Sequence, residues 1–359
     1  MPEKTMQSDE VLIDRIGSAG MIRLNRPKAL NSLNLGMVRI IKTAMADFAA
    51  DPDISCVVMT GEGERGLCAG GDIRAIYQTG RADDPDVTQF WREEFPLNYT
   101  IAHYPKPYVA LMDGIVMGGG VGISAHGKFR VVTERTRLAM PETGIGYFPD
   151  VGATWLLPRA PGEAGTWMGL TGLEIGAADA IQVRFADVCL PSEKLPEFVA
   201  ALGGLAGDAG DAGVQAVIDG FAVPAGESPL KLNADLSNRA FRFDTVEAIM
   251  EALAAEEGAF AEMTRDTIAR RSPTSLKLTL RLLRLGRDSS SLVQCLEREF
   301  TAGVEVLRNH DFYEGVRAAI IDKDRNPQWM PAALAEVTDA DIDRYFMPKH
   351  AVLFPDHRL

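Results

Sequence analysis

Short apolar runs and amphipathic stretches alternate along the first half of the chain. Two runs, 11–16 and 21–24, predict strands on either side of a turn at 17–20. Apolar residues at helical spacing then predict a helix that ends near Ala50 and is capped by Asn31 or Ser32. Further apolar runs predict buried strands at 56–60, 108–112 and 129–133. This order predicts an α/β fold in which both faces of the sheet are covered.

The pattern changes after about residue 200. A stretch rich in Gly, Ala and Asp, 203–213, is typical of a linker or loop. The remaining chain is dominated by helical periodicity, and Ser272 followed by Pro273 is a helix-start signal. We therefore expect an α/β core at 1–202 and a helical C-terminal region at 203–359 that packs on it. The helices are expected at 245–254, 260–271, 275–285 and 291–306.

Composition narrows the classes of partner. The net charge is −13, which disfavours nucleic acid and anionic membrane surfaces as partners. The longest apolar run is shorter than the 18 residues that suggest a membrane span, and the polar first ten residues do not resemble a secretory signal. Four cysteines lack C-x-x-C spacing, and the histidines lack zinc-site spacing. We expect a cytoplasmic protein with reduced thiols, or a mitochondrial matrix protein if the source is eukaryotic.

The candidate chemistry lies in a glycine run at 117–122 and in Glu142 about twenty residues later. Glycines leave backbone N–H groups open to a ligand oxygen, and paired N–H groups stabilise the oxyanion of an acyl-transfer intermediate. A dinucleotide-binding pattern at 120–125 lies too far into the chain, and Ser124 with His126 misses the spacing of a serine-hydrolase elbow. The remaining alternative is that the glycines only allow close packing.

Further motifs occur in a fixed order along residues 10–200. They are Leu24 to Asn31, Cys68 to Ile73, Lys106 to Ala110, Gly114 with Met117 to Gly122, Met140 to Glu142, and Leu170 to Gly172. Together these motifs resemble the crotonase (enoyl-CoA hydratase/isomerase) superfamily. The resemblance implies a ββα superhelical core, acyl-CoA thioester substrates and an oxyanion held by two backbone N–H groups.

The segments 92–94, 141–152, 311–318 and 322–329 narrow the resemblance to the 3-hydroxyisobutyryl-CoA hydrolase branch, which acts in valine breakdown. The resemblance implies N–H donors at Gly71 and Gly119, a catalytic Glu142 and an acyl-end acid at Asp150. It implies that the following residues contact the substrate: Glu94, Lys28, Ala29, Leu30, Ala69, Gly70, Asp72 and Ile73. It implies no metal or organic cofactor beyond the CoA of the substrate, and a possible homo-oligomer.

One position departs from the hydratases of the superfamily. Where a hydratase carries a second glutamate, two residues after the third glycine, this chain has Gly122. A single glutamate cannot share a water as the hydratase pair does, so a hydrolase is favoured over a standard hydratase. The alternatives are a hydratase or isomerase that uses an atypical acid, and a non-catalytic CoA-binding protein. Each candidate also has a structural explanation: Asp72 as a helix cap, Glu94 on a solvated helix face, and Asp150 in a turn.

Overall fold

The computed structural model describes residues 9–82, 84–348 and 350–355. Most of the polar N-terminal segment expected not to be a secretory signal therefore lies outside the described residues. Within these ranges, no helix combines the length and apolar character needed to cross a bilayer.

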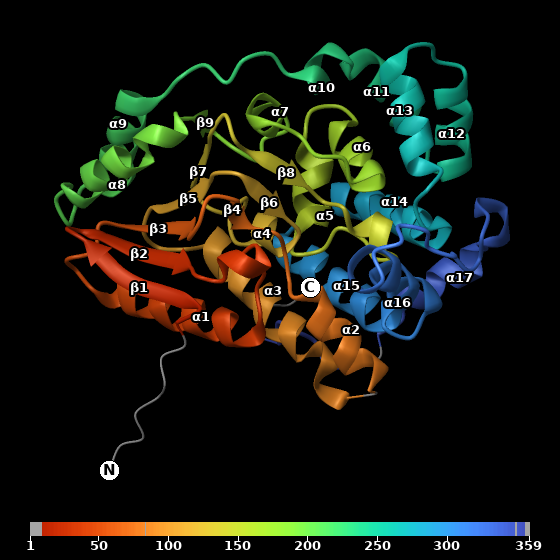
Figure 1. Cartoon of the computed structure of the whole chain (residues 1–359), viewed down its shortest axis with the longest axis horizontal. Helices are drawn as coiled ribbons and strands as arrows, with labels where there is room; N and C mark the ends of the chain where they lie inside the picture. The colour runs from red at the N-terminus through yellow and green to blue at the C-terminus, as the bar shows by residue number, and fades with distance from the viewer. Residues whose placement is uncertain (1–8, 83, 349, 356–359) are drawn as a thin grey trace.

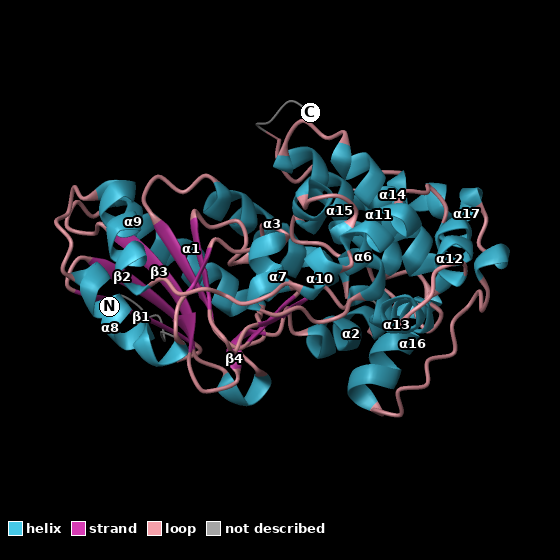
Figure 2. Cartoon of the chain, turned by 90° about the horizontal axis from the view of Figure 1, so that it is seen from above, coloured by secondary structure: helices cyan, strands magenta, loops and turns pink. Residues whose placement is uncertain are grey.

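A six-stranded sheet forms one end of the molecule (Figure 2). Its order is β1-β2-β3-β5-β7-β9; only the β1–β2 pair is antiparallel, and the other pairs are parallel. The bounds are β1 Val11–Ile16, β2 Ala19–Leu24, β3 Cys56–Gly61, β5 Tyr108–Met112, β7 Phe129–Val132 and β9 Val188–Cys189.

Both faces of this sheet are buried, as the apolar strands predict. Met21 and Val58 belong to a core shared with α8 (Leu195–Gly203) and α9 (Gly210–Phe221). Ile22 and Val57, which alternate with them, belong to the main core, which also contains buried residues of α1 (Leu35–Ala50) and α3 (Gln89–Ala102). Successive strand residues point to opposite faces, so this alternation confirms a sheet covered on both sides.

A second, three-stranded sheet positions the candidate site. It has the order β4-β6-β8 and is entirely parallel. Its strands are short: β4 Gly66–Cys68, β6 Ile115–Met117 and β8 Arg137–Ala139. Because the three strands are parallel, the loops that follow them all emerge at the same edge.

The C-terminal helices wrap around this core (Figure 1). After α9 the chain crosses to a group of helices on the far side and then returns beside the core in α14, α15 and α16. The fold is therefore α/β with a helical C-terminal region, as predicted. The bounds of the remaining helices are α2 Ile73–Arg81, α4 Gly119–Gly122, α5 Ala153–Leu156, α6 Ala164–Thr171, α7 Ala177–Gln182, α10 Pro229–Leu232, α11 Ala234–Phe241, α12 Val246–Ala254, α13 Ala259–Ile268, α14 Pro273–Arg287, α15 Leu292–Val306, α16 His310–Val316 and α17 Asp339–Asp343.

Helix starts agree with the sequence in two places and disagree in a third. Ser272 caps α14 by accepting the Ser275 N–H at 3.0 Å, and Asp72 caps α2, as expected. The expected cap of α1 was wrong. Asn34 caps it, by accepting the Met37 N–H at 2.9 Å, whereas Asn31 has a positive φ of 55° in the preceding turn.

The stretch 203–213 is also more ordered than a linker. Residues 210–213 form the first turn of α9, because Val214 and Ile218 further along this helix are buried against the sheet. The boundary between residues 202 and 203 stays a prediction.

Candidate active site

Three candidate residues follow the carboxyl ends of the three parallel strands of the second sheet. Gly71 follows β4, Gly119 follows β6, and Glu142 follows β8 in a 3₁₀ turn, η3 (Glu142–Ile145). Parallel strands end at a common edge, so residues far apart in sequence meet there. All three line one cavity of about 160 Å³.

The glycine backbone presents two donors to this cavity. In the described part of the chain, the loop hydrogen bonds use the N–H groups of Asp72 and Val121 but not those of Gly71 and Gly119. The two glycines are close, since a Cβ added to Gly119 would lie 3.3 Å from the Gly71 nitrogen. Gly118, with φ 50° and ψ −121°, has a conformation that is essentially restricted to glycine. The arrangement can hold an oxyanion.

Gly120 in the same run has a packing role. A Cβ there would overlap the Cys68 carbonyl oxygen, so the close approach of α4 to β4 requires glycine. Ser124, which follows, donates its hydroxyl to the Gly120 carbonyl at 2.6 Å, whereas His126 contacts the Val151 carbonyl. Ser124 and His126 are therefore not arranged as a nucleophile and its base.

Glu142 is buried against the glycine run. The residue is 7% exposed, and its Oε1 would lie 3.0 Å from a Cβ added to Gly118. Oε2 is buried without a hydrogen-bond partner in the described chain. Burial raises the pKa of Glu142 well above its usual value, and the nearby Asp150 raises it further. Such a carboxyl is a stronger base than an exposed one when it ionises.

Two further acids line the cavity. Glu94, from α3, is 1% exposed, and Asp150, from the loop after η3, is 6% exposed. Burial raises the pKa of both residues. The nearby Asp150 raises the pKa of Glu94 further, and the nearby Glu299 raises the pKa of Asp150 further. Like charges this close favour retaining at least one proton among the three carboxyls. The site therefore offers both a proton donor and a base.

Aromatic side chains complete the wall. Tyr147 stacks on Trp91 with ring centres 5.6 Å apart, and both line the cavity. Phe312 from α16 and Ile320 from the following π-helix, η6 (Arg317–Ile321), line it too. Phe312 and Ile320 lie more than 100 positions after the sheet in the sequence, and they help to enclose the three acids.

Sequence and structure comparisons agree on the family. The sequence profile described as Enoyl-CoA hydratase/isomerase matches residues 19–346. The chain belongs to the enoyl-CoA hydratase/isomerase family. A curated relative from Xenopus tropicalis, "3-hydroxyisobutyryl-CoA hydrolase, mitochondrial", is 44% identical over 351 residues, which cover 96% of this chain and 91% of the relative.

Solved structures of enoyl-CoA hydratase/isomerase relatives have the same fold. A "Carnitinyl-CoA dehydratase from Mycobacterium thermoresistibile" aligns with a TM-score of 0.90 and 44% identity, covering 96% of this chain and 98% of that one. An "enoyl-CoA hydratase from Rhodobacter sphaeroides 2.4.1" aligns with a TM-score of 0.85 and 39% identity, covering 95% and 98%. The crotonase-like core expected from the motifs is confirmed. The relatives carry different activities in their names: the curated relative is named a hydrolase, and the two solved relatives a dehydratase and a hydratase.

The residues expected to contact the CoA part of the substrate lie partly in the cavity wall and partly in a turn outside it. Ala69, Gly70 and Ile73 line the cavity. The Asp72 side chain caps α2 and forms an ion pair with Arg26 at 3.0 Å, whereas the expected contact to CoA is made by the backbone of this segment. These placements leave the substrate contacts as predictions.

Lys28, Ala29 and Leu30 form a separate turn outside the cavity. The turn is joined to the cavity wall because the Ala69 N–H donates to the Leu30 carbonyl at 3.0 Å. In the described ranges, no three His, Cys, Asp or Glu side chains are grouped to hold a metal.

The sequence interpretation missed two buried polar residues near the site. Asn98, one turn after Glu94, has both side-chain polar atoms unpartnered in the described chain. Glu299 on α15 lies beside Asp150. A signal for Glu299 existed, because it is an acid at helical spacing among apolar residues such as Leu296 and Val306, which form the buried face of α15.

Proposed function

We propose that this chain hydrolyses a short 3-hydroxyacyl-CoA thioester, namely 3-hydroxyisobutyryl-CoA, to 3-hydroxyisobutyrate and CoA in valine breakdown. The curated relatives named for this activity cover nearly the whole chain. The observation that carries the proposal is that Glu142 faces two backbone donors, with Gly122 where a hydratase has its second glutamate.

In the proposed reaction, the thioester oxygen binds between the N–H groups of Gly71 and Gly119. Ionised Glu142 attacks the thioester carbon, the C–S bond breaks, and CoA leaves as a thiol after gaining a proton. Water then cleaves the mixed anhydride and restores the carboxylate. Alternatively, Glu142 takes a proton from water, which attacks the same carbon. Asp150 binds the substrate hydroxyl or protonates the leaving sulfur, and Glu94 contacts the acyl group.

The proposal includes no metal and no organic cofactor apart from substrate CoA. A homo-oligomer stays a prediction. The curated relatives are named mitochondrial, which supports a matrix location if this chain comes from a eukaryote.

A thiol-release screen across short acyl-CoA thioesters, with and without a 3-hydroxyl, tests the function. We expect release to be fastest with 3-hydroxyisobutyryl-CoA. Loss of the double-bond absorbance of crotonyl-CoA without thiol release would instead support a hydratase, the activity for which the Rhodobacter sphaeroides relative is named. CoA binding without either reaction would support a non-catalytic protein.

Trapping distinguishes the two roles of Glu142. Hydroxylamine added during turnover converts an anhydride into a hydroxamate on Glu142, which mass spectrometry of the peptide detects. A single turnover in H₂¹⁸O adds a second test, because attack on the Glu142 carbonyl leaves label in the enzyme. We expect the hydroxamate, because Gly122 leaves Glu142 without the partner carboxylate that helps a hydratase to position water.

A further inference from the structure

The turn that carries Asp150 has an unfavourable backbone. Val151 has a positive φ of 53°, and Gly152 follows with φ 82°. A positive φ is a genuine outlier for a β-branched residue, so the backbone of this turn is strained. Val151 also lines the cavity beside Asp150. Something outside the turn must hold it in this conformation.

Glu299, on α15, accepts three hydrogen bonds from this turn. Its carboxylate accepts the N–H groups of Gly152 at 2.7 Å and Thr154 at 3.0 Å, and the Thr154 hydroxyl at 2.5 Å. Gly152 and Thr154 lie at the start of α5, whose first N–H groups have no partner within the helix. Glu299 therefore caps α5 from a helix nearly 150 residues away in sequence.

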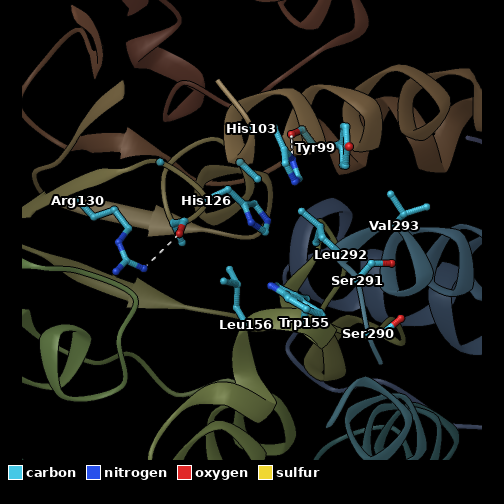
Figure 3. A pocket seen from close by; sticks show the side chains of 13 residues that line it. Tyr99, His103, His126, Arg130, Trp155, Leu156, Ser290, Ser291, Leu292 and Val293 are labelled. Carbon is cyan, nitrogen blue, oxygen red and sulfur yellow. Dashed lines mark hydrogen bonds between the residues drawn. The ribbon is translucent and has the colours of Figure 1, made fainter. Parts of the chain in front are cut away.

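His126 contacts the turn at a different atom. Its Nε2 lies 2.7 Å from the Val151 carbonyl oxygen, and since that oxygen only accepts, Nε2 carries the proton. Burial lowers the pKa of His126 to about 4, so the ring is neutral near pH 7. His126 also lines a separate cavity of about 650 Å³, where its ring points toward Trp155 and Leu292 (Figure 3).

We propose that Glu299 is a positioning residue of the reaction. By capping α5 it holds Val151 in its left-handed conformation and so fixes the direction in which the neighbouring Asp150 carboxylate enters the cavity. This inference rests on the proposed function, because turnover reports it.

The charge of Glu299 also acts on Asp150. The groups that face Glu299 are Asp150, Tyr147, Cys295 on its own helix, and Arg298, whose charge favours ionised Glu299. Burial raises the pKa of Glu299 to about 7 despite its three donors. Ionised Glu299 in turn raises the pKa of Asp150. Removing the charge should move the limb of the kcat/KM profile that reports Asp150 to lower pH.

The test compares Glu299→Gln with Glu297→Gln. Glu297 is a second buried acid of α15, but its carboxylate accepts the N–H groups of Leu353 and Phe354, away from the turn. An amide at position 299 places N–H groups against the donors of the turn. We expect kcat to fall roughly 10–100-fold with KM little changed, because displacements of about 1 Å cost this much. Glu297→Gln should stay within about twofold and keep the wild-type pH profile.

A double variant separates positioning from general stability. If Glu299 acts through Asp150, Glu299→Gln should change kcat by less than about twofold in an Asp150→Asn background. Equal losses in both backgrounds, or an unchanged kcat in folded Glu299→Gln, would overturn the inference. A wild type that releases no thiol from any substrate would instead reject the proposed function.

If circular dichroism shows that Glu299→Gln does not fold, Thr154 provides the second test. Thr154→Val removes one donor to Glu299 while keeping the shape, and Thr154→Ser keeps the hydroxyl. A loss of kcat in the valine variant alone supports positioning. Equal rates in both variants contradict it.

Discussion

Gly119→Ala tests the proposed oxyanion site without removing a donor. Gly119 does not have a positive φ, so alanine fits the backbone and keeps its N–H. The added methyl would lie 3.3 Å from the Gly71 nitrogen and 2.6 Å from Glu94 Oε1. It therefore occupies space between the paired donors, and Glu94 must move to relieve the overlap.

We expect this displacement to cost about as much as losing one oxyanion donor. That loss lowers kcat by about 10²–10³, equivalent to about 2.7–4 kcal/mol of transition-state stabilisation. Thiol release from saturating substrate measures kcat, and circular dichroism confirms the fold. Glu94 Oε1 has no hydrogen-bond partner in the described chain, so its movement breaks none there, and the effect should be on rate more than on stability.

Gly220→Ala is the matched control. A Cβ at Gly220 meets no atom within 4 Å, and this residue lies in α9, away from the cavity. It should keep wild-type turnover and add about 0.5–1 kcal/mol of stability, because alanine favours a helix more than glycine does. A folded Gly119→Ala enzyme that turns over within about twofold of wild type would refute an oxyanion role for Gly119.

Glu142→Gln should lower kcat by about 10²–10⁴ in the thiol-release assay without changing the circular dichroism spectrum, and retained turnover would contradict a catalytic role. The same variant should unfold at a higher denaturant concentration than wild type near pH 7. Because the pKa of Glu142 is raised in the folded protein, its contribution to stability is fully present below its unfolded pKa of about 4.5 and is lost as pH rises through its folded pKa. The stability advantage of the glutamine variant should therefore disappear at acidic pH. Asp150→Asn should slow hydrolysis of 3-hydroxylated substrates more than that of acyl-CoA lacking the hydroxyl, and equal slowing would argue against a contact with that group. Gly122→Ala should lower both Tm and turnover, because its Cβ would lie 2.7 Å from Val151 Cβ and 2.8 Å from Asn98 Nδ2; an unchanged Tm would show that this packing is looser than the structure indicates.

That last overlap changes what the sequence suggests about position 122. From the motif alone, Gly122→Glu should add a second carboxylate near Glu142. In the structure the position is already filled by neighbouring atoms, so a glutamate there would disturb packing before it could act as an acid. The absence of a carboxylate was readable from the sequence, whereas the absence of space for one was not.

Local patterns predicted the strands, the cap at Ser272 and the α/β class, because these depend on nearby residues. They could not separate Glu93 from Glu94. In the structure, Glu93 pairs with Arg39 at the surface, whereas Glu94 is buried in the cavity. Adjacent helix positions differ by about 100° in direction, so only the packing of α3 decides which acid turns inward.

Long-range contacts account for the rest of what was missed. Asn34 replaced the expected cap because Asn31 is used to tie the preceding turn to Gly66 and Glu62. Glu299 reaches the Asp150 turn only through tertiary packing of α15. No local pattern encodes either contact, since each depends on a segment more than 30 residues away.

Because Phe312 and Ile320 complete the cavity wall, the site closes only after residues 312–320 have been synthesised. On the ribosome, the strands and loops that bear Gly71, Gly119 and Glu142 emerge well before α16. Until then the cavity lacks this part of its wall, and its apolar lining stays open to wrong partners. A nascent chain that stopped before residue 310 would therefore carry the proposed catalytic groups without part of the enclosure that buries them.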